Sequence, residues 1–105
     1  MIQETRTIWN AIILAGRGEI TTTLQAVSEV VEGVNKIEGA LVCQKFSNFS
    51  NSHPIFFSHR GDATHEDAEG LIPPMSTVTM YFNDWRDLPN FVSGHTVEMG
   101  VVIIQ

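Results

Sequence analysis

The alternation of apolar and polar residues along the chain predicts five strands. Residues 5–15, TRTIWNAIILA, are apolar on both faces of an extended chain, which is typical of a central strand. Residues 76–82, STVTMYF, alternate strictly and predict a half-buried strand, and residues 96–104, TVEMGVVII, predict a final strand. Residues 40–46 and 55–59 predict two more, joined as a hairpin by the turn-forming sequence SNFSNSHP.

Residues 22–36 carry apolar side chains at helical spacing and predict the clearest helix. Thr22 and Gln25 have the spacing of a capping box, in which each side chain bonds to an exposed backbone amide of the first turn. The apolar stripe consists of Leu24, Val27, Val31 and Val34, extended by Ile20 and Val30.

A second, shorter helix is predicted after Asn83 or Asp84, either of which can cap it, and Gly94 would end it. Pro89 restricts this helix because proline has no amide donor and fits best in the first turn. Its apolar face would consist of Trp85, Leu88, Phe91 and Val92.

The order of these elements predicts an α+β fold. Gly16-Arg17-Gly18 is expected to break the first strand, ahead of the helix. Without the hairpin return, the order is strand, helix, strand, strand, helix, strand, which is the ferredoxin-like arrangement of an antiparallel sheet with two helices on one face. Since the strands are also apolar on the opposite face, a second copy of the chain is expected to cover it, giving a homodimer.

Composition limits the chain to one ordered domain, residues 1–105. Apolar residues make up 43% of the 105 and charged residues 17%, which suffices for a hydrophobic core and is atypical of a disordered chain. Cys43 is the single cysteine, so no intrachain disulfide can form.

The charge of the chain argues against nucleic acid as a partner. Six basic residues are scattered among twelve acidic ones, for a formal net charge of −6, so no basic stripe is available to neutralise phosphates. The first sixteen residues lack the basic and apolar regions of a secretory leader, and no apolar run approaches the roughly 18 residues needed to cross a bilayer. From the lack of such a leader and of such an apolar run, we expect a cytoplasmic protein with no membrane partner.

Two segments resemble the dimeric α/β-barrel superfamily, which includes the antibiotic-biosynthesis monooxygenases. They are MYFNDWRDLPNFVSGH, from Met80 to His95, and NKIEGALVCQKF, from Asn35 to Phe46. The resemblance implies a dimeric barrel in which Asn10, Trp85 and His95 line a pocket for a small aromatic or polyketide-like ligand. In the enzymatic version it implies a monooxygenase that needs no metal and no cofactor, with Asn10 and Trp85 holding the substrate and His95 moving a proton.

The residues themselves leave simpler interpretations open for each of these positions. Asn10 interrupts an apolar strand face, and its amide could equally pair with neighbouring backbone. Trp85 shares the predicted helix face with apolar residues and could be a packing anchor. His95 follows a glycine and could be a cap or a surface residue.

The segment HRGDATHEDAEG, residues 59–70, is the other candidate for chemistry. His59, Asp62, His65 and Glu66 offer metal-binding atoms, but the segment matches no established metal motif. We interpret it as a solvated connection between strands, and we give its Arg-Gly-Asp tripeptide no role in adhesion because short tripeptides recur by chance.

Two functional hypotheses follow from the sequence. In the first, the chain is a homodimer that binds a small apolar or aromatic ligand and, as an enzyme, oxidises it. In the second, it is a non-enzymatic acidic interaction protein, of the viral assembly or inhibitor type, that docks a protein partner through its acidic loop or its final apolar strand.

Overall fold

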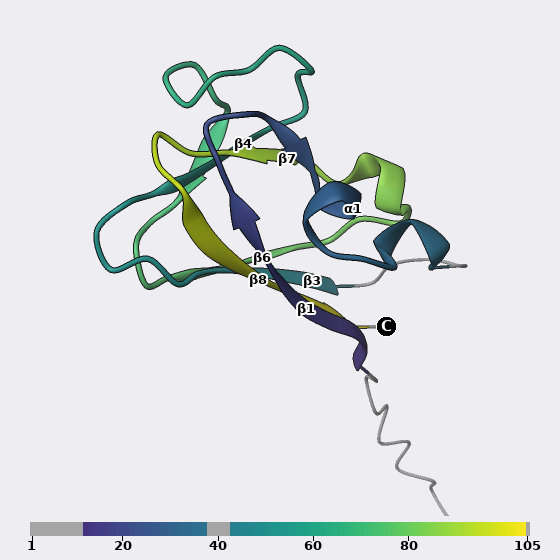
Figure 1. The fold of residues 1–105 in the computed structure, drawn as a ribbon. Coiled ribbons are helices and arrows are strands. Elements are labelled where there is room, and N and C mark those ends of the chain that lie inside the picture. Colours follow the sequence, from purple (N-terminus) through teal and green to yellow (C-terminus); the bar gives the residue numbers. More distant parts are fainter. Residues whose placement is uncertain (1–11, 38–42, 105) are drawn as a thin grey trace, which may run out of the picture.

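The fold is a sandwich of two antiparallel sheets. A computed structural model of the chain describes residues 12–37 and 43–104 (Figure 1). Sheet A has the strand order β1-β8-β3-β6, with β1 Ile12–Ile20, β8 Val97–Ile104, β3 Cys43–Asn48 and β6 Thr77–Met80. Sheet B has the order β2-β7-β4-β5, with β2 Gln25–Ala26, β7 Asn90–Val92, β4 Ile55–Ser58 and β5 Gly70–Ile72.

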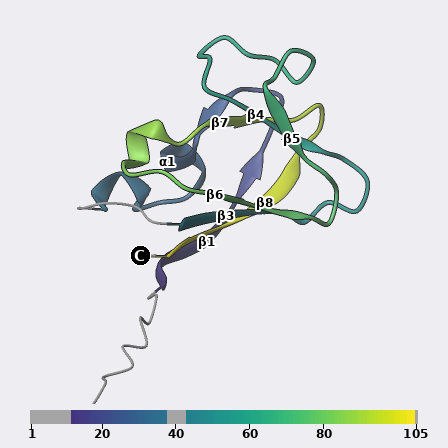
Figure 2. The same ribbon diagram turned by 180° about the vertical axis from the view of Figure 1, so that it is seen from behind.

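Helical structure is minor and lies at one side of the sandwich. The helix α1, Val27–Val30, and the 3-10 helices η1, Val34–Lys36, and η2, Trp85–Asp87, lie together beside the two layers (Figures 1 and 2). The described part of the chain contains no helix with the length and apolar character needed to cross a membrane.

The hydrophobic core lies between the sheets and is formed by alternate residues of the strands. Val97, Met99, Val101 and Ile103 point inward from β8 and are all buried. Phe46 of β3 meets Phe91 of β7 across the two layers, with ring centroids 4.9 Å apart. The inner face of sheet A is therefore filled by sheet B and α1.

The ferredoxin-like prediction, an α+β sheet with two helices on one face in a dimeric α/β-barrel, is wrong. The described residues form two mostly β layers with one four-residue α-helix. The predicted hairpin is also wrong, because β3 pairs with β6 and β8 whereas β4 pairs with β5 and β7 in the other sheet.

The helix predicted over residues 22–36 fails because of its own residues. Its apolar stripe is rich in valine, whose branched Cβ restricts side-chain rotamers in a helix. Gly33 takes a left-handed conformation, with φ of 94°, between α1 and η1 and interrupts helical geometry. Val27, Val31 and Val34 are nevertheless buried, so the apolar pattern identified the core residues and not their secondary structure.

The second predicted helix shrinks to η2 for a related reason. Asp84 caps it as predicted, accepting a hydrogen bond from the Arg86 amide at 2.9 Å. Leu88 precedes Pro89, and that position is driven toward extended backbone, here with ψ of 141°. The chain therefore leaves the helix after one turn and continues as β7.

Gly16 and Gly18 do not break the first strand. β1 runs through both, and each faces inward against the segment that follows β2. A Cβ on Gly18 would lie 2.3 Å from the carbonyl oxygen of Val30, and one on Gly16 would lie 2.7 Å from the side chain of Val31. These glycines are required because α1 packs directly on the strand.

Two buried polar side chains of β3 bind the backbone of neighbouring segments, and one of them, Asn48, links the two sheets. Asn48, at the end of β3, donates from Nδ2 to the carbonyl oxygens of His53, at 2.8 Å, and Ile72, at 3.0 Å, while its Oδ1 accepts from the Ser50 amide. Gln44 bonds through both side-chain atoms to the backbone of Phe82 just beyond β6. These bonds satisfy polar groups that would otherwise be costly to bury.

We expect Gly18→Ala to destabilise the fold by about 1–3 kcal/mol, because its methyl group meets a backbone carbonyl that cannot move aside. Gly61→Ala is the matched control, since no atom lies within 4 Å of its added Cβ, and should stay within about 0.5 kcal/mol. Urea unfolding measures both. Equal stability of the two variants would show that α1 does not pack on β1 as described.

We expect Asn48→Asp to cost about 3 kcal/mol or more at neutral pH. The change keeps the shape of the side chain but replaces the donor with a carboxylate oxygen facing two carbonyl oxygens. Asn51→Asp introduces the same charge at an exposed position and should be nearly neutral. Thermal unfolding of both variants checks this, and a small loss in Asn48→Asp would contradict the proposed role of the amide.

Candidate functional site

The outer face of sheet A is the most distinctive surface of the described residues. Along β1, the outward side chains change from apolar, at Ile13 and Ala15, to charged, at Arg17 and Glu19. Along the antiparallel β8 the same change runs from Ile104 and Val102 to Glu98. Along β1 and β8 the face therefore changes from an apolar end to a charged end.

The apolar end is open to solvent. A register irregularity between Ile12 and Leu14 leaves two consecutive isoleucines of β1 outside the core, with Ile12 64% and Ile13 38% exposed. Tyr81, just beyond β6, is 73% exposed. These exposed apolar side chains would be buried if a partner covered the outer face of the sheet.

Arg17 lies between two shallow hollows of the outer face. One, of about 330 Å³, is lined by β1 and by residues 96–98, including Glu19 and Glu98. The other, of about 360 Å³, is lined by Ala15, Phe49 and Val102, among others. The Arg17 guanidinium pairs with Glu98, at 3.5 Å from Nη1 to Oε1, and lies 4.8 Å from the centroid of the Phe49 ring. It can therefore present both a cation and an aromatic surface to a partner.

Phe49 is held on the face by a glycine. Its amide donates to the carbonyl oxygen of Glu98 at 3.1 Å, which continues the β3–β8 pairing by one residue. A Cβ on Gly100 would come within 2.6 Å of the Phe49 ring, so the ring lies directly over this glycine. The ring covers the strand at a position that has no side chain of its own and remains 42% exposed.

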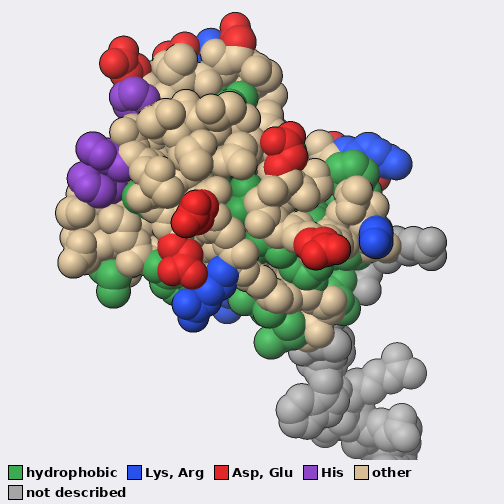
Figure 3. All heavy atoms as spheres, viewed as in Figure 1, with side chains coloured by type: hydrophobic (Ala, Val, Ile, Leu, Met, Phe, Trp, Pro, Cys, Tyr) green, Lys and Arg blue, Asp and Glu red, His purple; other side chains and the backbone are tan. Residues whose placement is uncertain are grey.

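The charges on the outer face are balanced. Glu19 and Glu98 lie directly opposite each other across the β1–β8 pair, an arrangement that is unfavourable for like charges. Arg17 pairs with Glu98, and Lys45 of β3, which lies opposite Val102 and so nearer the apolar end, adds a second cation to the face. Figure 3 shows acidic and basic side chains side by side over the region of β1 and β8.

The structure does not bring the residues predicted for a pocket together. Asn10 lies outside the described residues. Trp85, in η2, packs partly against the core beneath the guanidinium of Arg86, whereas His95, in the turn after β7, stacks on His53 with ring centroids 3.8 Å apart. Trp85 belongs to η2, which precedes β7, and His95 follows β7, so the two residues lie at opposite ends of that strand, and neither lines the two hollows. Their catalytic role stays a prediction.

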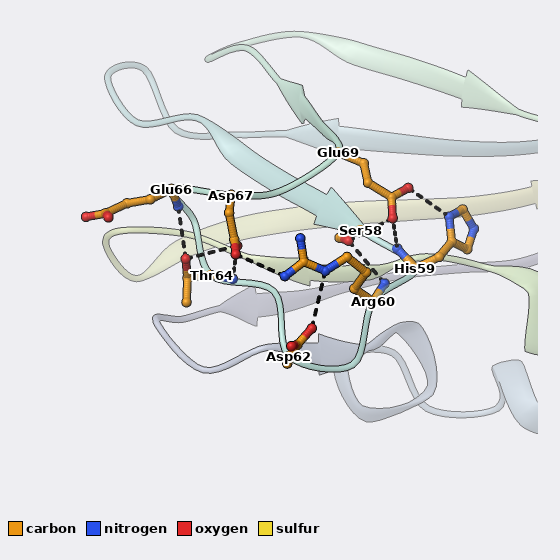
Figure 4. A network of polar contacts seen from close by, with 8 residues as sticks. All are labelled: Ser58, His59, Arg60, Asp62, Thr64, Glu66, Asp67 and Glu69. Carbon is orange, nitrogen blue, oxygen red and sulfur yellow. Dashed lines mark hydrogen bonds and ion pairs between the residues drawn. The ribbon is translucent and has the colours of Figure 1, made fainter.

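The loop of residues 59–69 is ordered by its own polar contacts and stands out beyond β4 (Figure 1). Figure 4 shows Asp67 turned toward Thr64 and Arg60, and Glu69 turned toward Ser58 and His59. Arg60 pairs with Asp67 at 3.0 Å and with Asp62 at 3.3 Å. The Arg-Gly-Asp tripeptide therefore has its arginine bound within the loop.

The four candidate metal ligands of this loop do not converge on one point. His59 contacts Glu69 at 3.4 Å and the Asp87 carbonyl oxygen at 3.0 Å, and Asp62 pairs with Arg60. His65 lies 3.9 Å from Glu66 and packs near Phe56. Within residues 12–37 and 43–104, no three His, Cys, Asp or Glu side chains are grouped to hold a metal ion.

The same contacts shift two carboxyl groups of the loop. The backbone amide and hydroxyl of Thr64 donate to Asp67 and hold the pKa of its carboxyl below the ordinary value, with Arg60 adding to the effect. The Ser58 hydroxyl, followed by His59, similarly lowers the pKa of Glu69. Both groups favour the ionised state in the folded loop.

Sequence reasoning missed Arg17 and Phe49 as surface features. Arg17 was placed in a strand break, because two flanking glycines normally mark a turn. Phe49 was placed in a turn, although a lone aromatic residue within the polar sequence SNFSNSHP was a signal that its side chain needed a partner. That partner, Gly100, lies 51 residues later in the chain.

Comparison of the chain with protein-family models, with curated proteins and with solved structures finds no match. The resemblance to the dimeric α/β-barrel superfamily therefore stays without support from these comparisons, and the fold expected from it is replaced by the sandwich.

We expect the order of the 59–69 loop to depend on pH through Asp67 and Glu69. Because their pKa values are lowered by folding, their stabilising contribution is complete above the ordinary values of 3.8 and 4.5 and is lost as the pH falls through the folded-state values. NMR relaxation of the Thr64 and His59 amides between about pH 6 and 2.5 should show the loop loosening at the acidic end.

Asp67→Ala should loosen the loop at every pH in that range, since Thr64 and Arg60 lose their shared acceptor. Glu66→Ala is the control, because the Glu66 side chain is 83% exposed and its nearest charged partner is 3.9 Å away. Unchanged relaxation in Asp67→Ala would show that the network does not order the loop.

Proposed function

We propose that this domain is a protein-docking module that binds its partner through the outer face of sheet A. The observation that carries the proposal is the combination, on one strand-built surface, of exposed apolar side chains with Arg17 held over the Phe49 ring. Aromatic residues and arginine are enriched in protein interfaces, where they supply large contact areas.

The shape of the face favours a protein over a small molecule. The two hollows lie open on the surface on either side of Arg17. Small-molecule sites usually enclose most of the ligand surface, whereas a protein partner can cover a broad, shallow face. A small aromatic ligand held jointly by Trp85 and His95 would require groups that lie at opposite ends of β7.

The acidic loop is a weaker candidate for docking than the sheet face. Asp62, Asp67 and Glu69 already have partners within the loop or in the adjoining strand β4. A basic partner would have to compete with these contacts, which would reduce the net gain. The outer face of sheet A needs no such rearrangement to expose Phe49.

A photo-crosslinking experiment tests this proposal. Benzoylphenylalanine would replace Phe49 on the face or, as a control, Leu71 on sheet B, because the native side chains are similarly exposed at 42% and 47%. Irradiation in extract of the source organism should give protein adducts from position 49 and few from position 71, measured by mass spectrometry.

The adducts should also depend on the charged part of the face. Arg17→Glu, combined with the crosslinker at position 49, should reduce their yield about tenfold if a charge contact is lost and a repulsion introduced. Arg86→Glu is the matched control, since Arg86 also pairs with a carboxylate, Asp84, and lies over an aromatic ring, Trp85. Equal yields from positions 49 and 71, or no response to Arg17→Glu, would contradict the proposal.

A further inference from the structure

We infer that the partner of this face is a second copy of the chain, packed sheet A against sheet A in a two-fold dimer. The inference rests on the proposed docking function and names its partner. It is carried by the charge balance of the face, by its apolar end and by the way the inner face of sheet A is already occupied.

The charge balance of the face suits self-association. The chain has a formal net charge of −6, so two copies repel each other over most of their surfaces. On the outer face of sheet A, two cations, Arg17 and Lys45, stand with two anions, Glu19 and Glu98. This face can therefore meet its own copy without bringing net charge together.

The charges are also arranged for a symmetric contact. A two-fold interface uses the same surface patch on both copies, so each charged group must find its counterpart on that same patch. Arg17 is 67% and Glu98 50% exposed at the side chain, which leaves both free to make a second contact across an interface. Across a two-fold interface, Arg17 of each copy then pairs with Glu98 of the other copy.

The apolar end of the face provides the hydrophobic surface that a dimer would bury. Ile13, Ala15, Val102 and Ile104 point outward, while the opposite face of the same strands is filled by sheet B and α1. The remaining apolar surface of sheet A can be covered only from outside. Two sheets that pack face to face lie about 10 Å apart, with their strands within about 30° of each other.

The size of the face predicts a modest affinity. With strands about 4.8 Å apart and residues about 3.3 Å apart, the four strands present roughly 400 Å² before side-chain relief is added. Stable interfaces typically bury about 800 Å² on each partner, so this sheet surface lies below the usual range and the dimer is expected to be weak. Association should accordingly be concentration-dependent and weakened by salt.

Sedimentation equilibrium of the full chain from roughly 5 to 500 µM, a range suited to small interfaces, tests the inference. The wild-type chain should show a monomer–dimer equilibrium. Arg17→Glu and Glu98→Arg should each weaken dimerisation by at least about tenfold, because each places like charges against each other twice. An equimolar mixture of the two variants should recover association, since every Arg17–Glu98 contact across the interface then joins opposite charges.

Arg86→Glu again serves as the control and should leave the dimer unchanged, because it makes the same charge reversal away from sheet A. Circular dichroism verifies that each variant is folded. A wild-type chain that stays monomeric at the highest concentration of this range overturns the inference. So does a dimer that survives both face variants, since it would use another surface, such as the free edge of β1.

The two proposals fail separately. If the chain is monomeric but the crosslinker at position 49 still captures another protein in an Arg17-dependent way, the docking function stands and the second copy is wrong as its partner. If the crosslinker captures neither this chain nor another protein, both proposals fall.

Discussion

The hydrogen bonds of the Asn48 side chain are the constraint on which the arrangement of the sandwich depends. Asn48 is buried at the end of β3 in sheet A, yet it donates to Ile72 in sheet B and to the segment that leads into β4. Because successive side chains alternate, its neighbour Phe49 points to the opposite side of the strand, where its ring packs over Gly100. One buried amide thus links the two sheets and also directs the ring that distinguishes the outer surface.

Close packing on the inner side of sheet A determines which surface is left for interaction. Gly16 and Gly18 allow the segment at Val30 and Val31 to approach β1, where any larger side chain would clash. The inner face is consequently filled, since the core there also contains the phenylalanines of both layers. Among the described residues, the outer face and the loops are the parts that stay exposed to a partner.

Polar contacts in the loop and on the sheet face differ in their consequences. In the 59–69 loop, the carboxylates of Asp67 and Glu69 accept hydrogen bonds from within the loop or from β4. These contacts stabilise the conformation of the loop. On the sheet face, Arg17 pairs with Glu98, yet both side chains stay at least half exposed, so their charges remain accessible to a partner. Accessible charge beside exposed apolar surface is what makes this face, and not the acidic loop, the better candidate for recognition.

The sequence by itself determined several of the extended segments and many of the buried side chains, because alternation and apolar spacing follow from local backbone geometry. Strands were predicted over 55–59, 76–82 and 96–104, and each overlaps an observed strand, while the valines of 22–36 are core residues as expected. Only the tertiary structure decided how the strands pair. It also decided that residues 22–36 are mostly not helical, because long-range packing overrides weak helix propensity. The candidate face likewise required it, since Arg17, Phe49 and Gly100 meet only when distant strands are paired, and no local pattern records such a contact.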